Sequence, residues 1–254
     1  MLSLIDNILI LVTAMVCAFF TMAVMNRIWP AKVRYATEDL IGWQLNVLAT
    51  TQAVILGFMF YTVWTNFTAA QLNVDLEASS LTNVYRLAAG LPAASRTQVE
   101  SLARSYAEAV IHEDWPEMAQ GEIPDGGSHI ANEQLWRVLT TTQTATASES
   151  TAQDHALSEL SNLAQLRRTR FIQSATHLPA IFWCVLLVGG VLTIFSVAMF
   201  GSRSYPVHLF QVLSLTLLVS LSLLAIADLD HPFRGWIHID NYPFQRALQN
   251  MHVL

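Results

Sequence analysis

The chain has 254 residues, of which 53% are hydrophobic and only 13% are charged, and its mean hydropathy is +0.40. Soluble globular proteins usually carry about 25% charged residues. The composition is therefore typical of an integral membrane protein. The formal net charge of −6 excludes a nucleic-acid-binding function, because such binding requires a concentrated basic surface.

Four apolar segments are long enough to cross a bilayer, whose hydrocarbon core of about 30 Å requires about 20 residues of helix. None contains Lys, Arg, Asp or Glu, so each is predicted to be a transmembrane helix. They are Ile8 to Met25, Leu45 to Trp64, Leu178 to Phe200 and Val207 to Ala227. The first segment lacks a preceding basic region and a following Ala-x-Ala-like site, so we interpret it as a helix and not as a signal peptide.

The second apolar segment continues beyond the membrane as one helix. Apolar residues recur at helical spacing past Trp64, and the first stop signals are Gly90 and Pro92. From Leu45 to Ala89 such a helix would be about 65 Å long. A single rod would thus carry residues from the membrane into an extramembrane domain, as in ion channels.

Three further helices are predicted before the third span, and period-two alternation typical of strands is absent. They are expected from Ser95 to Pro116, from Ile130 to about Thr142 and from Ser150 to Pro179. The predicted fold is an all-α integral membrane protein: four transmembrane helices with a helical extramembrane domain inserted between the second and third. The expected divisions are 1–67 (first two spans), 68–177 (extramembrane domain), 178–228 (last two spans) and 229–254 (C-terminal segment).

One face of the second span carries small and weakly polar residues among bulky apolar neighbours. Its members are Asn46, Thr50, Ala53 or Val54, Gly57 and Tyr61. This face is typical of a pore lining, but equally of close packing between helices. Asn46, together with Gln52 nearby, is expected to hydrate the mouth of a pore or to pack helices.

Other polar residues near the spans have alternative interpretations. Arg167, Arg168 and Arg170 precede the third span and are expected to contact lipid headgroups, to pair with acidic residues of the domain or to attract anions. A second cluster follows the fourth span and offers carboxylate and imidazole groups to a divalent cation. It comprises Asp228, Asp230, His231, His238 and Asp240.

The spacing of this second cluster matches no metal signature, and helix capping is the favoured interpretation. We predict no metal, cofactor or catalytic residue. Cys17 and Cys184 lie within spans and are interpreted as small hydrophobic side chains.

Several short strings resemble a family of bacterial membrane proteins, long described only as a domain of unknown function and now regarded as bestrophin-like. They lie between Trp43 and Gly235, which is most of the chain. The strings are Leu56-Gly57-Phe58, Trp64, Glu77, Tyr85-Arg86, Glu113-Asp114-Trp115-Pro116 and the closing Asp230-His231-Pro232-Phe233-Arg234-Gly235.

The resemblance implies a function and a pore. Bestrophins are pentameric anion channels in which the second of four spans lines a pore with an apolar neck. Neck residues recur at every fourth position up to the aromatic of the Leu-Gly-Phe-like string, which implies Phe58, Val54 and Thr50 here. Thr50 departs from the bulky apolar residue of the family pattern.

The resemblance also implies a structural turn after the last span, made here by Asp230, Pro232, Phe233 and Gly235. In bestrophins this turn precedes an acidic cluster that helps to bind Ca²⁺ in the animal members. That cluster is missing from this chain, so calcium activation is not expected.

We therefore expect a multi-pass protein of the bacterial inner (plasma) membrane that contacts membrane lipid and forms a homo-oligomer, a pentamer by the resemblance. It would conduct small inorganic ions, preferentially anions, without a chemical step. One alternative is a non-conducting scaffold or sensor whose helical domain binds a partner. Another is a membrane enzyme that uses the cluster after the fourth span with a metal.

Overall fold

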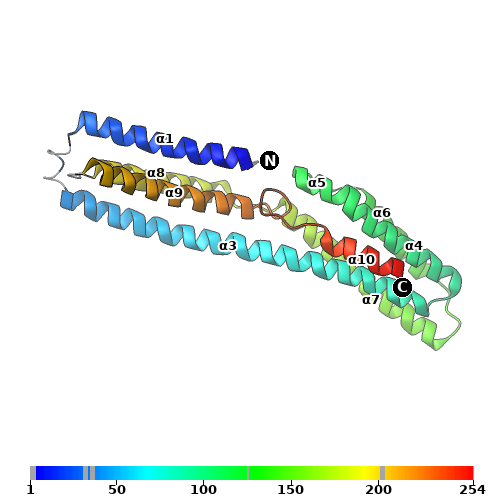
Figure 1. The fold of residues 1–254 in the computed structure, drawn as a ribbon. Helices are drawn as coiled ribbons and strands as arrows, with labels where there is room; N and C mark the ends of the chain where they lie inside the picture. The colour runs from blue at the N-terminus through cyan, green and yellow to red at the C-terminus, as the bar shows by residue number, and fades with distance from the viewer. Residues whose placement is uncertain (1–3, 31–33, 35–37, 125, 201–203, 254) are drawn as a thin grey trace. The chain divides into compact units, whose positions relative to one another are not determined.

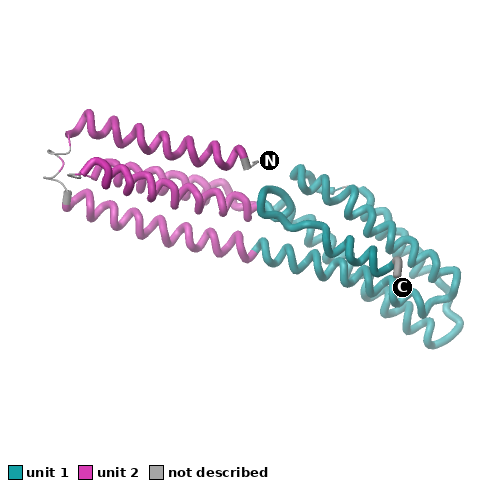
Figure 2. Tube along the Cα trace, in the orientation of Figure 1, with its two compact units in different colours: residues 1, 66–176, 231–254 teal, residues 2–65, 177–230 magenta. Residues whose placement is uncertain are grey.

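The computed structural model describes residues 4–30, 34, 38–124, 126–200 and 204–253. Every regular element among these residues is helical, so the predicted all-α class is confirmed (Figure 1). The chain divides into two compact units (Figure 2). We call residues 2–65 and 177–230 the apolar unit, and residues 66–176 and 231–254 the polar unit.

The apolar unit contains α1 (Leu4–Ile28), the first part of α3 (Glu38–Leu87), α8 (Ala180–Met199) and α9 (Tyr205–Leu229). Among the described residues, four helices are long and apolar enough to cross a membrane, and they lie at the four predicted spans. The third begins after Pro179, as proline favours the first turn of a helix and disfavours its interior.

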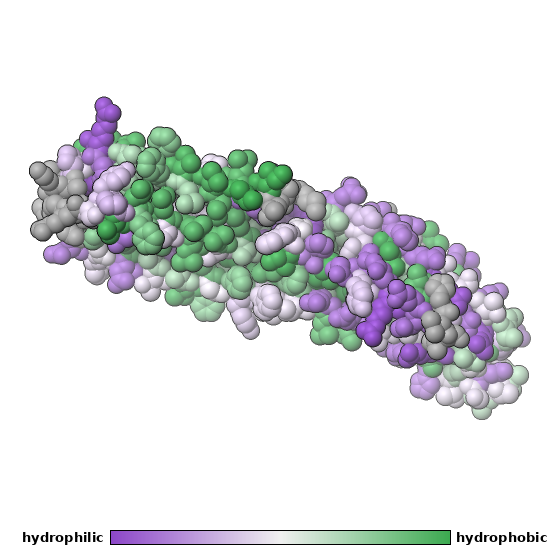
Figure 3. All heavy atoms as spheres, viewed as in Figure 1, coloured by the Kyte–Doolittle hydropathy of each residue, from purple (hydrophilic) through white to green (hydrophobic). Residues whose placement is uncertain are grey.

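Large apolar side chains cover the outside of this unit. Ile181, Val191 and Phe210 are each at least 65% exposed, and the surface over these helices is predominantly hydrophobic (Figure 3). A surface of this kind is unfavourable in water and favourable in lipid. The exposure pattern therefore agrees with a membrane environment for the apolar unit.

Helices α1, α8 and α9 pack around a small core in the apolar unit. Met22 and Val212 are fully buried, and Ala18 and Ala198 contribute to the same cluster. Small residues such as these alanines let helix backbones approach closely, which is the main source of packing energy within a bilayer.

Arg34 caps the C-terminus of α8. Its guanidinium donates to the backbone oxygens of Ala198, Met199 and Phe200 at 3.0, 3.1 and 3.3 Å, and it also contacts the side-chain oxygen of Asn26. The last carbonyls of a helix have no partner within it and carry partial negative charge. The fully buried arginine therefore satisfies groups that would otherwise be unpaired.

The polar unit contains, among the described residues, the remainder of α3 and seven further helices or helical turns around a buried core. These elements are η2 (Ala88–Gly90), α4 (Ala93–Ala109), η3 (Val110–Asp114), α5 (Trp115–Gln120), α6 (Gly127–Thr141), α7 (Ala147–Ala175) and α10 (Tyr242–Val253). Helices α4 and α6 pack against each other, and Tyr106 and Leu135 are fully buried.

Two local predictions about this unit were wrong. The helix expected to end at Pro116 continues through a π-helical segment, η3, because Pro116 occupies the first turn of α5, where no backbone N–H is needed. The helix expected from Ser150 begins at Ala147, with Thr146 and Glu149 forming a capping box. No element was predicted for the segment 229–254, which contains α10 (Tyr242–Val253).

We predict that Arg34→Met destabilises the protein by about 1.5–3 kcal/mol, because the end of α8 loses a charged hydrogen-bond donor. The measurement is thermal or denaturant unfolding of the full chain in detergent. Arg27→Met is the matched control, since Arg27 is an exposed cation in the last turn of α1. Equal stability of the two variants would contradict the role of Arg34.

Candidate functional site

The stripe predicted to line a pore lies on the open surface of α3. All of its residues are exposed in the single chain, and Phe58 and Tyr61 are 64% and 68% exposed. The stripe comprises Asn46, Thr50, Val54, Gly57, Phe58 and Tyr61. These side chains are therefore not used in packing within the chain, and they are available to another copy, to lipid or to water.

Gly57 stands at the edge of this stripe. A Cβ added to Gly57 would meet nothing within 4 Å, so close packing within the chain does not require a glycine there. Gly57 also lines a cavity of about 450 Å³ in the apolar unit, together with Ala53 of α3 and Val219 of α9. The other residues of the stripe do not line that cavity.

Gln52 anchors a different face of α3. Its side chain is 4% exposed, and its Nε2 donates to the backbone oxygen of Leu186 on α8 at 3.0 Å. A Cβ on Gly189 would overlap the Gln52 amide, so a larger residue there would displace that amide. Of the two roles expected for Gln52, the structure places it in helix packing.

Within the polar unit, α3 is anchored by a buried ion pair. Arg170 of α7 contacts both carboxylate oxygens of Glu77, through Nε at 2.8 Å and Nη2 at 3.1 Å. The same guanidinium bonds Asp114 at 2.9 Å. All three side chains are buried. Because an isolated buried charge is very unfavourable, this arrangement fixes α3, α7 and η3 relative to one another.

Hydrogen bonds from neutral side chains complete the ion pair. Tyr106 donates to Glu77 Oε1 at 2.7 Å, and Ser128 donates to Asp114 Oδ2 at 2.6 Å. We call Glu77, Tyr106, Asp114, Ser128 and Arg170 the buried charge network. Its members come from α3, α4, η3, α6 and α7, so it joins five elements of the polar unit.

Aromatic rings surround the Arg170 guanidinium. Its central carbon lies 5.7 Å from the ring centre of Trp115 and 4.8 Å from that of Phe171. Trp115 in turn donates from Nε1 to the backbone oxygen of Ile239 at 3.3 Å. Phe233 packs edge-on against Trp115, with 5.6 Å between ring centres. The aromatic groups exclude water and add cation–π attraction.

The residues predicted to form a structural turn have distinct local roles. Phe233 is buried against Trp115, and the oxygen of Pro232 accepts the N–H of Ile239 at 2.8 Å. Gly235 has a φ of 105°, a left-handed conformation that favours glycine. In the apolar unit, Asp230 Oδ1 accepts the N–H of Leu178 at 2.9 Å.

Two residues of the suggested metal cluster make contacts within their own segment. His238 Nδ1 lies 3.1 Å from the oxygen of Gly235, and Asp240 Oδ1 accepts the N–H of Tyr242 where α10 begins. Such contacts are the turn and capping roles that the sequence favoured for this segment.

Burial and charge shift two pKa values in the network. Burial and the adjacent Glu77 carboxylate raise the pKa of Tyr106 well above its usual 10.0. Burial alone would lower the pKa of Arg170, but the charge of Glu77 and its hydrogen bond raise it above the ordinary arginine value. Tyr106 therefore stays neutral and Arg170 stays charged at physiological pH.

Sequence reasoning named Glu77 and Asp114 but did not assign their partner. Arg170 was expected at lipid headgroups, paired with acidic residues or attracting anions, and the structure shows it paired with acidic residues. The sequence signal was weak, because Arg170 shares its segment with Arg167 and Arg168, and Arg168 is exposed.

Comparisons with known proteins identify one family. The family description "Bestrophin-like domain" matches residues 12–244. A mutant of a bacterial Bestrophin homologue from Klebsiella pneumoniae is 12% identical, with a TM-score of 0.73, over 97% of this chain and 99% of that chain. A structure of that homologue obtained by Zn-SAD phasing is 14% identical, with a TM-score of 0.64, over 96% and 97%. A comparison with curated protein sequences finds no match.

We predict that Arg170→Met destabilises the protein by about 3–5 kcal/mol, because Glu77 and Asp114 would remain buried without a cation. Unfolding is followed by intrinsic tryptophan fluorescence in detergent. The control is Arg168→Met on the same helix, whose side chain is exposed and whose loss should change stability by less than about 0.5 kcal/mol. A loss of stability in Arg168→Met but not in Arg170→Met would contradict the stabilising role of the buried charge network.

The pKa of Tyr106 predicts a specific alkaline sensitivity. Since the folded-state pKa is raised, the stability from the neutral phenol is complete below pH 10.0 and is lost as the pH rises above it. Tyr106→Phe should therefore lower the free energy of unfolding at pH 8 by about 1 kcal/mol. The same variant should lose less stability than the wild-type chain as the pH rises above 10. Tyr242→Phe, at an exposed tyrosine, should leave that decline unchanged.

Proposed function

The chain belongs to the Bestrophin-like family, and from this premise we propose that it forms a homo-oligomeric ion channel whose pore is lined by α3. The observation that carries the proposal is the orientation of α3. Gln52 and Glu77 hold one face of this helix against the chain. The stripe from Asn46 to Tyr61 stays exposed.

The proposed assembly gives the stripe a suitable environment. Hydroxyl and amide groups such as those of Thr50 and Asn46 are unfavourable toward lipid tails. A ring of copies, five by family resemblance, would turn these groups toward a shared aqueous channel. Apolar surface elsewhere on the apolar unit would remain in contact with lipid.

Three residues of the stripe would form the constriction. Thr50, Val54 and Phe58 recur at every fourth position, so their side chains lie one above another along α3. Phe58 supplies the largest apolar group and sets the narrowest apolar ring. The hydroxyl of Thr50 makes its own ring more hydrated than the apolar residue of the family pattern would.

The preference for anions is carried over from the family resemblance, and it is compatible with the uncharged stripe. The stripe contains no Asp or Glu, the residues whose rings select cations in many channels. Transport would be passive, with no chemical step. We place the channel in the bacterial inner membrane, with residues 68–177 as a helical extramembrane domain that extends the pore.

The test replaces the proposed constriction. Phe58→Ala should raise the single-channel conductance in planar bilayers several-fold, because a wider and better hydrated neck lowers the barrier to ions. Phe60→Ala is the matched control, since Phe60 lines the cavity toward α9 and not the stripe. The ratio of chloride to sodium permeability is measured in both.

Native mass measurement in detergent accompanies the recordings and is expected to show a pentamer. A monomer would contradict the channel and favour the scaffold or sensor. Unchanged conductance and selectivity in an oligomeric Phe58→Ala protein would remove Phe58 from the pore.

A further inference from the structure

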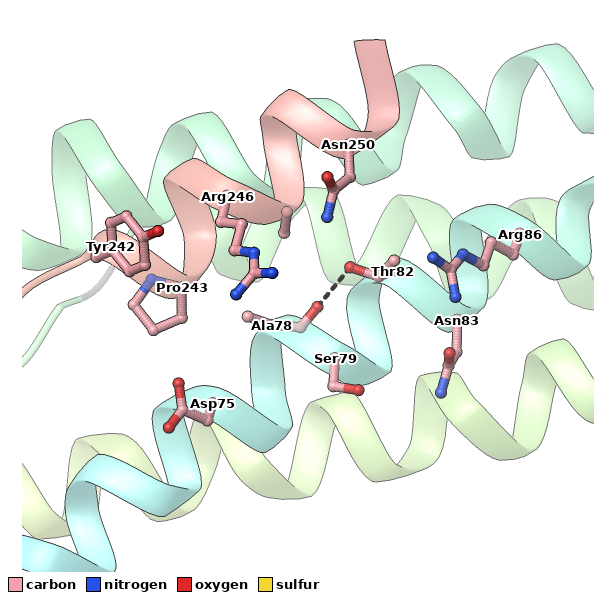
Figure 4. Close-up of a pocket in the computed structure, with 11 residues that line it drawn as sticks. Asp75, Ala78, Ser79, Thr82, Asn83, Arg86, Tyr242, Pro243, Arg246 and Asn250 are labelled. Atoms are coloured by element: carbon pink, nitrogen blue, oxygen red, sulfur yellow. Dashed lines mark hydrogen bonds between the residues drawn. The ribbon is translucent and has the colours of Figure 1, made fainter. Parts of the chain in front are cut away.

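A polar groove lies between α3 and α10 in the polar unit, outside the exposed stripe and the buried charge network. It encloses about 330 Å³. Helix α3 forms one wall of the groove with polar residues one and two turns apart, and α10 forms the opposite wall (Figure 4). The polar groups that line it are Asp75, Ser79, Thr82, Asn83, Arg86, Tyr242, Arg246 and Asn250.

Most of these polar groups are not used to hold the protein together. Thr82 donates to the backbone oxygen of Ala78 at 2.8 Å. Arg86 and Arg246, in contrast, form no ion pair with any described residue, and Asn83 and Asn250 form no side-chain hydrogen bond with one. The groove therefore offers two guanidinium groups and two amides to a ligand.

Charge is unevenly distributed along the groove. Asp75 lies near Pro243, Arg86 lies toward the Asn250 end, and Arg246 extends from α10 between them (Figure 4). From Asp75 to Arg86 is about 16 Å along the helix. A negative group is thus attracted to the arginine end and repelled from the Asp75 end.

We propose that the groove between α3 and α10 binds a small phosphate-bearing anion between Arg86 and Arg246. Guanidinium groups on two helices, joined by the amides of Asn83 and Asn250, can donate from several directions. Phosphate accepts through oxygens arranged tetrahedrally, whereas a carboxylate offers only two in one plane. The volume is at the lower end of about 300–1,000 Å³ for small-molecule sites, which favours a small ligand over a macromolecule.

Such a phosphate can belong to a soluble compound or to a lipid headgroup, and two measurements separate these sources. Inorganic pyrophosphate is titrated into the full chain in phosphate-free detergent buffer, with heat of binding as the readout. Phospholipid that remains bound after purification is measured by native mass spectrometry. Saturable pyrophosphate binding assigns the groove to soluble phosphates. Phospholipid whose retention requires Arg86 and Arg246 assigns it to a lipid headgroup.

The variants distinguish this site from general surface charge. Arg86→Gln and Arg246→Gln should each weaken pyrophosphate binding, or reduce retained phospholipid, about tenfold, the equivalent of one lost charged contact. Asp75→Asn should strengthen binding, because it removes a nearby negative charge. Arg168→Gln, which removes an exposed arginine of α7 outside the groove, should have no effect.

Unfolding curves of the four variants establish that each is folded, and the replaced side chains are exposed. Two results would overturn the proposal: neither ligand bound by the wild-type chain, or binding that Arg86→Gln and Arg246→Gln leave unchanged. The proposal does not depend on conduction, so its failure would leave the channel proposal intact.

Discussion

The salt bridge between Glu77 and Arg170 requires α3 and α7 to lie side by side, since neither charge can be buried alone. Gln52 imposes a comparable constraint on α3 in the apolar unit, through one hydrogen bond to α8. On a regular helix these two residues are about seven turns apart and within about 20° of the same face. Thr50, Val54 and Phe58 lie on the remaining surface, so the polar anchors determine which face of α3 stays exposed.

How much of the fold could be predicted from sequence depends on how strongly the membrane and the backbone constrain each segment. Spans are recognisable because a bilayer demands long uncharged segments, and the four helices agree with them. The continuation past Pro116 was missed because a proline usually ends a helix, whereas here a π-helical segment places it in a first turn. Helix α10 was not predicted, because the sequence after the last span was interpreted only as a turn and a C-terminal segment.

The candidate site shows a similar division. The exposed stripe follows from helical spacing except at Phe58, which the family resemblance supplied, and all of its residues were named in advance. The partner of Glu77 was not assigned, because three arginines occur within four positions and only the folded chain shows that Arg170 is the buried one. The groove between α3 and α10 was also inaccessible, since it pairs residues such as Arg86 and Arg246 that are far apart in sequence.

The central claim is that the face of α3 opposite Gln52 and Glu77 contacts water in the assembled protein. The most direct measurement is labelling with a charged, membrane-impermeant thiol reagent, after Cys17→Ser and Cys184→Ser remove the native thiols. Thr50→Cys and Val54→Cys should be modified, and modification should change the current. Val191→Cys, on the exposed surface of α8, should be protected by lipid. Protection of positions 50 and 54 as complete as that of position 191 would contradict the account.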